Sequence, residues 1–304
     1  MVKMHENELE IDKCLVRSLL KSQCPQWADL SLSQVQSSGT DNALFRLGTE
    51  YVVRLPRIEW ESGSIEIKIN KEYMWLPKIA KYLNVPISFP VFKGNPSKDY
   101  PYSWLIVQWE EGHNPDFENQ NEYKMLAKDL ADFLNDFHKI NLKNGPTSRR
   151  GIRLSENELN VETKKAISEL NGEINIPLIS ALWEELSNIA YWNKEPVWIH
   201  GDFLPGNILI QDNRLKAVLD FTDIGIGDPA CDLVIAWALF NPSSRRIFKE
   251  NLEFIDDETW ERGRGWALSI ALIMLPYYKL SNPTLAVLAR RMIANVLSDW
   301  HEHH

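Results

Sequence analysis

The stretch VWIHGDFLPGNILI, residues 197–210, interrupts two apolar runs with a polar loop. Residues 197–200 and 207–210 have the aliphatic and β-branched composition of short strands. The loop between them contains Asp202 and, five residues later, Asn207. An ordinary polar turn would explain this pattern, and so would a site that holds a carboxylate and an amide around one ligand. The residues that follow favour the second interpretation.

A further acidic residue belongs to the same predicted substructure. QDNR reads as a turn, and residues 215–221 (LKAVLDF) are predicted to return antiparallel to NILI. Asn207 would then open one strand and Asp220 would close the other, so we expect both to lie near Asp202. Carboxylate and amide oxygens are hard donors that suit Mg²⁺. Phosphoryl transfer needs such a metal on the phosphates and a carboxylate for the proton of the acceptor, so the trio predicts this chemistry.

The predicted secondary structure changes along the chain. The predicted elements of the first part are a helix over 10–22, a hairpin over 43–56, a helix over 64–76 that Pro77 ends or kinks, and a strand over 102–109. From the amphipathic helix over 121–140 onward, helical patterns dominate. We therefore predict an α+β fold with a sheet-rich first part, a mainly helical second part and a ligand site between them.

Composition limits the possible partners. The 304 residues have a net charge of −9, which disfavours nucleic acid and anionic membranes and favours a cationic small substrate. Cys14, Cys24 and Cys231 form no CxxC pair, which argues against a disulfide framework or a zinc site. The first residues show no secretory signal, and the apolar stretch 267–278 is too short to span a bilayer. We expect a cytoplasmic, monomeric protein without a nucleic-acid or membrane partner.

The motif HGDFLPGN, followed by LDFTDIGIGDPACDL at 219–233, resembles the aminoglycoside phosphotransferases, which are antibiotic kinases with a protein-kinase-like fold. Weaker similarity extends from about residue 30 to 298. The resemblance implies a small β-rich N-terminal lobe, residues 1–109, that binds the nucleotide. It implies a larger, mainly helical C-terminal lobe, residues 110–304, for catalysis and substrate binding.

The same resemblance assigns roles in the catalytic loop. Asp202 is implied as the catalytic base, Asn207 and Asp220 as Mg²⁺ ligands, and His200 as a structural residue that braces the loop. Taken singly, an Asp or Asn at a strand end is more often a turn or cap residue. Their combination is what makes the assignment specific.

In the N-terminal part, VQSSGTDNALFRLG stands where a kinase has its glycine-rich loop. Ser37, Ser38 and Gly39 would contact phosphate there, although an ordinary hairpin turn fits equally well. Arg54 occupies the position of the lysine that holds the α- and β-phosphates, and its guanidinium suits phosphate oxygens. An outward-facing strand arginine is the alternative.

Glu72 on the following helix is implied as the ion-pair partner of Arg54, at the edge of a face that contains Ile69, Tyr73 and Leu76. Glu66 lies near the same edge. The alternative is that Glu72 is a solvent-exposed charge on the helix. The strand over 102–109 continues into the implied hinge, Gln108, Trp109 and Glu110, whose backbone would bind the purine.

Departures from the kinase pattern bear on the acceptor. Gly201 replaces the arginine that receives an activation-loop phosphate, and DFT replaces DFG. Only seven residues separate Asp220 from DPACDL, which leaves no room for a loop that displays a protein substrate. Macrolide-directed relatives tend to have His in place of Asn207, which favours an aminoglycoside-type site.

Three further aspartates follow Asp220. Asp228 before Pro229 matches a helix N-cap followed by proline at the first helical position, so we interpret it as structural. Asp223 is the better candidate for contact with a cationic acceptor. Asp232 is a second candidate for this contact, but a structural role fits it equally well.

Together these features predict a Mg²⁺-dependent enzyme that transfers the γ-phosphate of ATP or GTP to a hydroxyl of a small antibiotic, an aminoglycoside first of all, and so gives resistance. Three alternatives stay open: a macrolide kinase, a small-metabolite kinase of the choline or homoserine type, and a nucleotide-binding regulator without catalysis. The intact set of Asp202, Asn207 and Asp220 argues against the regulator, because a non-catalytic binder needs no base.

Overall fold

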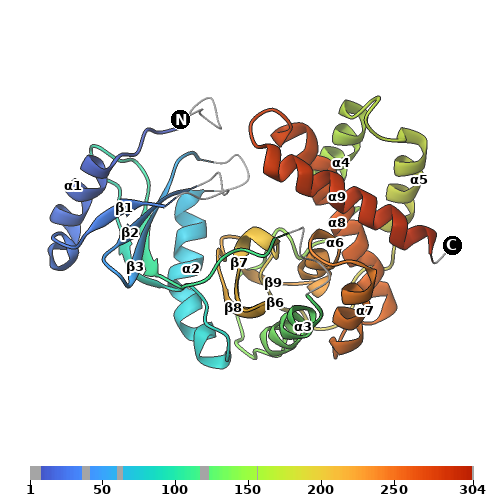
Figure 1. Cartoon of the computed structure of the whole chain (residues 1–304), viewed down its shortest axis with the longest axis horizontal. Helices are drawn as coiled ribbons and strands as arrows, with labels where there is room; N and C mark the ends of the chain where they lie inside the picture. The colour runs from blue at the N-terminus through green and yellow to red at the C-terminus, as the bar shows by residue number, and fades with distance from the viewer. Residues whose placement is uncertain (1–7, 36–41, 60–63, 117–122, 156, 303–304) are drawn as a thin grey trace. The chain divides into compact units, whose positions relative to one another are not determined.

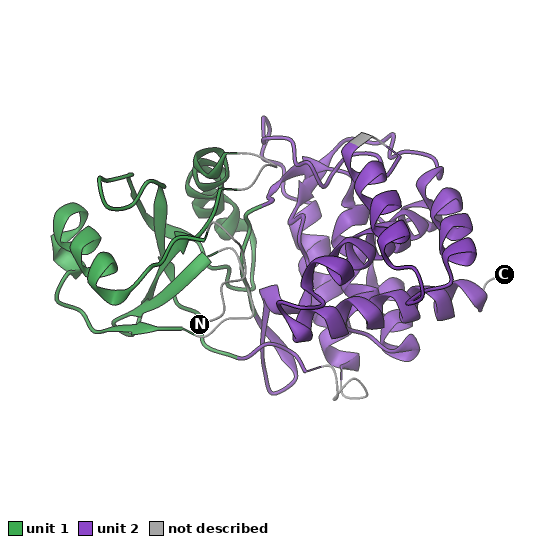
Figure 2. Ribbon diagram, turned by 90° about the horizontal axis from the view of Figure 1, so that it is seen from above, with its two compact units in different colours: residues 1–112, 217–222 green, residues 113–216, 223–304 purple. Residues whose placement is uncertain are grey.

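The computed structural model describes residues 8–35, 42–59, 64–116, 123–155 and 157–302 (Figure 1). The chain divides into two compact units (Figure 2). Unit 1 comprises residues 1–112 and 217–222, and unit 2 comprises residues 113–216 and 223–304. Unit 1 therefore includes a short segment from late in the chain, and this segment contains Asp220. The predicted phosphate-loop residues Ser37, Ser38 and Gly39 lie outside the described residues.

Unit 1 is built on a five-stranded antiparallel sheet with the order β1-β2-β3-β5-β4. Its strands are β1 (Leu32–Gln34), β2 (Asn42–Leu47), β3 (Tyr51–Pro56), β4 (Pro90–Gly94) and β5 (Trp104–Gln108). The predicted hairpin is confirmed by β2 and β3, which turn at Gly48 with a positive φ of 61°. In the register, Arg54 lies between Leu44 on β2 and Leu105 on β5.

Two helices pack on opposite faces of this sheet (Figure 1). Along β3, Val53 and Leu55 join the core cluster under α1 (Lys13–Gln23), whereas Val52 joins the cluster under α2 (Ile65–Ile79). Side chains alternate between the two faces of a strand, so Arg54 shares the face of Val52. Alternation thus turns Arg54 toward α2. The short helices η1 (Pro25–Trp27) and η2 (Ala80–Tyr82) follow α1 and α2.

Helix α2 begins at the N-cap Ser64 and continues through Pro77 to Ile79, beyond the predicted end at residue 76. Its buried side consists of Ile65, Ile69, Glu72 and Leu76, which recur at helical spacing. Glu72 is therefore at the centre of the buried face and only 1% exposed. Tyr73, which the sequence placed on that face, is 43% exposed.

Unit 2 is mainly helical. Its helices are α3 (Lys124–His138), α4 (Asn157–Glu169), α5 (Ile176–Ser187), η4 (Pro205–Asn207), η5 (Pro229–Val234), α6 (Ile235–Ala238), α7 (Pro242–Asn251), α8 (Asp257–Tyr278) and α9 (Pro283–His301). The apolar side of α3, with Leu126, Leu130, Phe133, Leu134 and Phe137, is buried as predicted. A sheet-rich unit followed by a helical one confirms the predicted α+β class. Within the described parts of the chain, no helix has both the length and the apolar character needed to cross a membrane.

Short strands frame the candidate catalytic loop. β6 (Val197–Ile199) pairs antiparallel with β9 (Gly225–Gly227). The hairpin predicted after the loop is confirmed by β7 (Ile208–Gln211) and β8 (Arg214–Val218), which form a two-stranded sheet. Its turn residues Asp212 and Asn213 have φ values of 52° and 58°, as a tight turn of this kind requires.

Asp256 caps the N-terminus of α8 and supports a testable prediction. Its Oδ1 accepts hydrogen bonds from the Thr259 backbone N–H at 2.9 Å and from the Thr259 hydroxyl at 2.5 Å, and its Oδ2 accepts one from Lys194 at 2.8 Å. Partial burial opposes ionisation, but these bonds lower the pKa of Asp256 to about 2 from its ordinary 3.8. We expect Asp256→Ala to reduce the free energy of unfolding at pH 7 by about 1 kcal/mol, the usual effect of losing a cap.

The pH dependence of this loss has a definite sign. Because the folded-state pKa of Asp256 is depressed, its stabilisation is present above about pH 4 and is lost as the pH falls toward 2. Urea unfolding at pH 7 and pH 3 measures this: the gap between wild type and Asp256→Ala should narrow at pH 3. Asp257→Ala is the control: Asp257 is 93% exposed and, among the described residues, pairs only with Lys249, at 2.9 Å on the surface, so its loss at pH 7 should be smaller than that of Asp256→Ala. A gap that widens toward pH 3 would contradict the assignment.

Candidate active site

The loop between β6 and β7 ties Asn207 to Asp202. Asn207 Nδ2 donates to the backbone carbonyl of Asp202 at 2.8 Å and to Oδ2 of its carboxylate at 3.0 Å. Leu204 N–H donates to the same carbonyl at 2.9 Å, which tightens the turn. With its nitrogen held by Asp202, the Asn207 amide presents its oxygen to any other ligand. That oxygen is the atom of the amide that a hard cation would bind.

The loop that contains Asp202 is anchored by Asp232 in η5. Its Oδ2 accepts from His200 N–H at 2.9 Å and its Oδ1 accepts from Gly201 N–H at 2.9 Å. His138 Nε2, at the end of α3, lies 3.2 Å from the same Oδ2. Asp232 is 0% exposed, so it is enclosed behind the loop and out of reach of an acceptor. Its structural role is the one that the burial favours, and sequence reasoning did not connect it with His138.

Aromatic packing fixes the same loop. Phe203 is fully buried and stacks on Phe133 of α3, with ring centroids 5.7 Å apart. His200 is also fully buried and meets Phe203 edge-on at 5.5 Å. The Asp202 N–H points to His200 Nδ1 at 3.2 Å. His200 therefore contacts Asp202 and Phe203, the two residues that follow Gly201, in agreement with a bracing role.

Gly201 explains the departure from the kinase His-Arg-Asp pattern. Its φ is +83°, a region that side chains rarely adopt, and a Cβ there would lie 2.7 Å from the Asp223 carbonyl oxygen. No arginine fits at this position without moving the segment after Asp220.

Asp223 faces two arginines. Its carboxylate lies 3.7 Å from Arg149 Nε and 3.8 Å from Arg150 Nε, and its side chain is 13% exposed. Its backbone carbonyl accepts from the Ser148 hydroxyl at 2.7 Å. A cationic acceptor at Asp223 would have to compete with two guanidinium groups, which weakens the predicted contact. Nothing in the sequence signalled these partners, because they come from a segment more than seventy residues earlier.

Asp228 has the structural role predicted for it. Its Oδ1 accepts from Ala230 N–H at 3.0 Å, which caps η5, and its Oδ2 accepts from Arg262 Nε at 2.7 Å. Asp228 is 1% exposed, and Arg262 pairs with it from α8. This buried pair joins the segment after β9 to α8.

A second group of predicted site residues gathers within unit 1. Arg54 Nη2 donates to Glu72 Oε1, and Arg54 Nη1 lies 3.6 Å from Asp220 Oδ1. Arg54 is 9% exposed, so it is not the outward-facing strand residue of the alternative interpretation. The other candidate, Glu66, instead pairs with Lys93. Burial raises the pKa of Glu72, whereas Arg54 opposes the rise.

The segment that contains Asp220 is fixed to unit 1 by backbone contacts. Val218 N–H donates to the Pro86 carbonyl at 3.1 Å, and Ser88 N–H donates to the Val218 carbonyl at 3.2 Å. Asp220 follows the end of β8 and has a φ of +54°, which Asp tolerates better than most residues. Non-glycine residues in this region are held there by their surroundings and cluster at functional sites.

The donor chemistry fits Mg²⁺. The Asp220 carboxylate and the Asn207 amide supply hard oxygens, and Mg²⁺ is usually held by one or two carboxylates together with substrate phosphates. Among the described residues, no group of three or more His, Cys, Asp or Glu side chains is placed to hold a metal alone. A shared metal site for Asn207 and Asp220 stays a prediction.

The predicted hinge lines a hollow of about 320 Å³ in unit 1. Its lining residues are Thr49, Glu50, Tyr51, Gln108, Trp109, Glu110 and Glu111. Trp109 N–H donates to the Glu50 carbonyl at 2.8 Å, and the Gln108 carbonyl accepts from the Ser88 hydroxyl at 2.9 Å. The Gln108 N–H also donates to the Phe89 carbonyl at 3.3 Å. Three of the backbone groups expected to meet a purine therefore already make protein hydrogen bonds, although a carbonyl oxygen can accept a second one.

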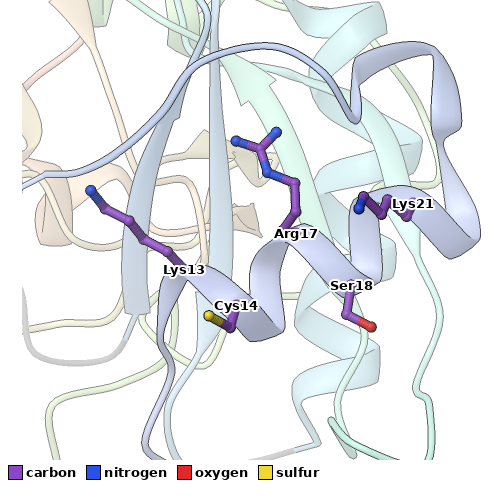
Figure 3. A pocket seen from close by; sticks show the side chains of 5 residues that line it. All are labelled: Lys13, Cys14, Arg17, Ser18 and Lys21. Atoms are coloured by element: carbon purple, nitrogen blue, oxygen red, sulfur yellow. The ribbon is translucent and has the colours of Figure 1, made fainter.

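A separate open hollow of about 530 Å³ lies on α1 (Figure 3). It is lined by Lys13, Cys14, Arg17, Ser18 and Lys21, and none of the predicted site residues is among them. Arg17 donates from this helix to the Leu30 carbonyl at 2.8 Å, which ties α1 to the chain before β1. All five lining residues belong to α1, so this hollow is separate from the candidate active site.

Comparison with known proteins gives the family context for this geometry. A family model described as the phosphotransferase enzyme family, APH, matches residues 33–266, more than half of the chain. Uncharacterized protein YcbJ of Bacillus subtilis strain 168 is 27% identical over 186 residues, which cover 60% of this chain and 56% of that protein. Aminoglycoside 3'-phosphotransferase of Escherichia coli is 25% identical over 189 residues, 59% of this chain and 64% of that enzyme. The chain thus spans less than two thirds of the length of both relatives.

Solved structures confirm the predicted kinase-like fold. The complex of APH(2")-IIia with GDP and kanamycin matches 94% of this chain and 99% of its own, with a TM-score of 0.68 and 18% sequence identity. Macrolide 2'-phosphotransferases share the fold as well. At such low identity, these similarities concern the fold alone.

Proposed function

The chain belongs to the phosphotransferase enzyme family, and from this premise we propose that it transfers the γ-phosphoryl group of ATP or GTP to a hydroxyl of a small molecule. An aminoglycoside antibiotic is the acceptor we propose, with resistance as the consequence. Curated relatives with aminoglycoside 3'-phosphotransferase in their names support this choice, as do solved neighbours that hold GDP, ADP or ATP. The working form we propose is a cytoplasmic monomer.

The observation that carries the proposal is the bond from Asn207 to the Asp202 carboxylate. It holds a potential base beside an amide whose oxygen is presented to a ligand, on a loop anchored by a buried aspartate. The Asn207 bonds fix Asn207 relative to Asp202, and Asp232 fixes the backbone of His200 and Gly201 just before them. In unit 1, the cluster of Arg54, Glu72 and Asp220 supplies a cation and a carboxylate for phosphates and their metal.

We assign one task to each group. Asp202 would orient the acceptor hydroxyl and receive its proton as the oxygen attacks phosphorus. Arg54, held by Glu72, would contact the nucleotide phosphates, and Gln108, Trp109 and Glu110 would lie along the purine. Asn207 and Asp220 would hold Mg²⁺, which when bound neutralises and orients the phosphates. The remaining contribution of the chain is positioning, because phosphoryl transfer needs little covalent chemistry from the protein.

Two observations keep a second acceptor class in consideration. Macrolide 2'-phosphotransferases share the fold, and Asp223 meets Arg149 and Arg150, which makes its surroundings less suited to a polycation. Asn207 in place of the histidine expected of macrolide-directed relatives favours the aminoglycoside. A metabolic kinase of the choline or homoserine type is the further alternative.

A coupled assay of ADP and GDP release tests the proposal. Purified protein is incubated with Mg²⁺, with ATP or GTP, and with aminoglycosides, macrolides, choline and homoserine in turn. We expect release to depend on an aminoglycoside, and mass spectrometry should show the phosphorylated product. Asp202→Asn protein in the same wells controls for contaminating kinases. Turnover with a macrolide alone would reassign the acceptor, and nucleotide binding without turnover on any compound would favour the regulator.

A further inference from the structure

Thr222 stands where the kinase pattern has glycine, and it contacts two of the charged residues in unit 1. Its hydroxyl lies 2.5 Å from Asp220 Oδ1 and 3.4 Å from Glu72 Oε1, and its backbone N–H lies 3.4 Å from the same Asp220 oxygen. We propose that Thr222 is a positioning residue, which fixes the orientation of the Asp220 carboxylate for Mg²⁺. This inference rests on the proposed function, since it concerns the metal that Asp220 would hold.

The contacts of Asp220 fall on one side of its carboxylate. Oδ1 receives the Thr222 hydroxyl and N–H and lies 3.6 Å from Arg54 Nη1. Among the described residues, no hydrogen bond or ion pair reaches Oδ2. A carboxylate held by one oxygen cannot rotate freely, so it presents the other oxygen in a fixed direction. Oδ2 is therefore the atom left for the metal.

The Thr222 hydroxyl adds what a glycine could not. A hydroxyl has one proton to donate, and the 2.5 Å contact assigns that proton to Asp220 instead of Glu72. A glycine at this position would leave only the backbone N–H, at 3.4 Å. A hydrogen bond to an ionised carboxylate is roughly twice as strong as one between neutral groups. Thr222 thus supplies the short contact that orients the carboxylate.

Thr222 also closes the group around Arg54. The guanidinium binds Glu72 and lies near Asp220, and both carboxylates are within reach of Thr222 Oγ1. Without the hydroxyl, only the 3.4 Å backbone N–H and the guanidinium of Arg54 would orient the Asp220 carboxylate. Partners that orient a metal ligand in this way typically change metal affinity when they are removed, while the ligand itself stays in place.

The test compares two substitutions at this position. Thr222→Val removes the hydroxyl and keeps the shape, and Thr222→Ser keeps the hydroxyl. Mn²⁺ replaces Mg²⁺ as the probe, and electron paramagnetic resonance measures free Mn²⁺ in the presence of non-hydrolysable ATP or GTP analogues. We expect Thr222→Val to weaken Mn²⁺ binding by roughly 10-fold, and Thr222→Ser to stay close to wild type. Calorimetry in EDTA should show unchanged nucleotide binding for both variants.

The outcomes separate this inference from the proposed function. If Asp220→Ala loses Mn²⁺ but Thr222→Val binds it like wild type, the role of Thr222 is wrong and the proposed function stands. Equal losses for Val and Ser, or a loss that persists in EDTA, would mean that Thr222 acts through packing, which also overturns the inference. If the wild-type protein binds no Mn²⁺ with either nucleotide, the proposed function and the role of Thr222 are both wrong. Thermal melting of each variant confirms that the protein compared is folded.

Discussion

Asp202→Asn protein should lose turnover by at least about 100-fold while its Mg²⁺–nucleotide affinity stays nearly unchanged. The substitution removes the charge and the basicity of the side chain and keeps its size. An asparagine oxygen can still accept the bond from Asn207 Nδ2, which now runs at 3.0 Å to the carboxylate. The anchoring of the loop through Asp232 does not involve the Asp202 side chain, so the fold should persist. The loss should therefore appear in kcat and not in nucleotide binding.

Asp257→Asn serves as the matched control, because it makes the same chemical change at a carboxylate of the same unit that is 93% exposed. Steady-state kinetics with the acceptor found in the screen, together with calorimetric titration of nucleotide, separate the two effects. Turnover that survives Asp202→Asn would exclude this residue as the base. A parallel loss of nucleotide affinity would assign it to binding.

Asn207→Ala and Asp220→Ala should each weaken nucleotide binding by at least about 10-fold in the presence of Mg²⁺, and have little effect in EDTA. The reason is that each residue has one atom held by a neighbour and one presented for a ligand. Asn207 Nδ2 is held by Asp202, and Asp220 Oδ1 is held by Thr222. The oxygen that each substitution removes would therefore contact the metal and not the nucleotide itself.

Each variant is its own control in this experiment, because the same protein is titrated with and without Mg²⁺. The result that would contradict the assignment is equal weakening in both conditions, which would indicate a direct contact with the nucleotide or a damaged site. A loss confined to one of the two residues would leave the other without a metal role. Circular dichroism of both variants shows whether the fold is intact.

Local patterns in the sequence predicted the elements that local physics controls. The hairpin of β7 and β8 is confirmed because its turn residues, Asp212 and Asn213, adopt the positive φ that such turns need. The cap at Asp228 is confirmed because an aspartate before proline satisfies the first N–H groups of a helix wherever it occurs. These are short-range effects, so a window of a few residues contains the relevant information.

Long-range partners could not be predicted in the same way. Helical spacing predicts Tyr73 on the buried face of α2 and Glu72 at its edge, because an acidic residue is rarely buried without a partner and Arg54 is eighteen residues away. The enclosure of Asp232 depends on His138 and the loop backbone, and the surroundings of Asp223 depend on Arg149 and Arg150. None of these pairs has a spacing that a sequence pattern records.

The sequence by itself determined which chemistry is present: a possible base at Asp202, hard oxygen donors at Asn207 and Asp220, and a cation at Arg54, on an α+β chain. Spacing is sufficient for Asp202, Asn207 and Asp220 because they lie within one loop and the hairpin after it, whereas the role of Arg54 follows from the resemblance to the kinase pattern. Only the tertiary structure decided how each group is oriented. It holds the Asn207 amide by its nitrogen, buries Glu72 against Arg54, and directs the Thr222 hydroxyl to one oxygen of Asp220. The physical reason is that a hydrogen bond or ion pair depends on where two side chains meet in space, and chain folding alone brings these residues together.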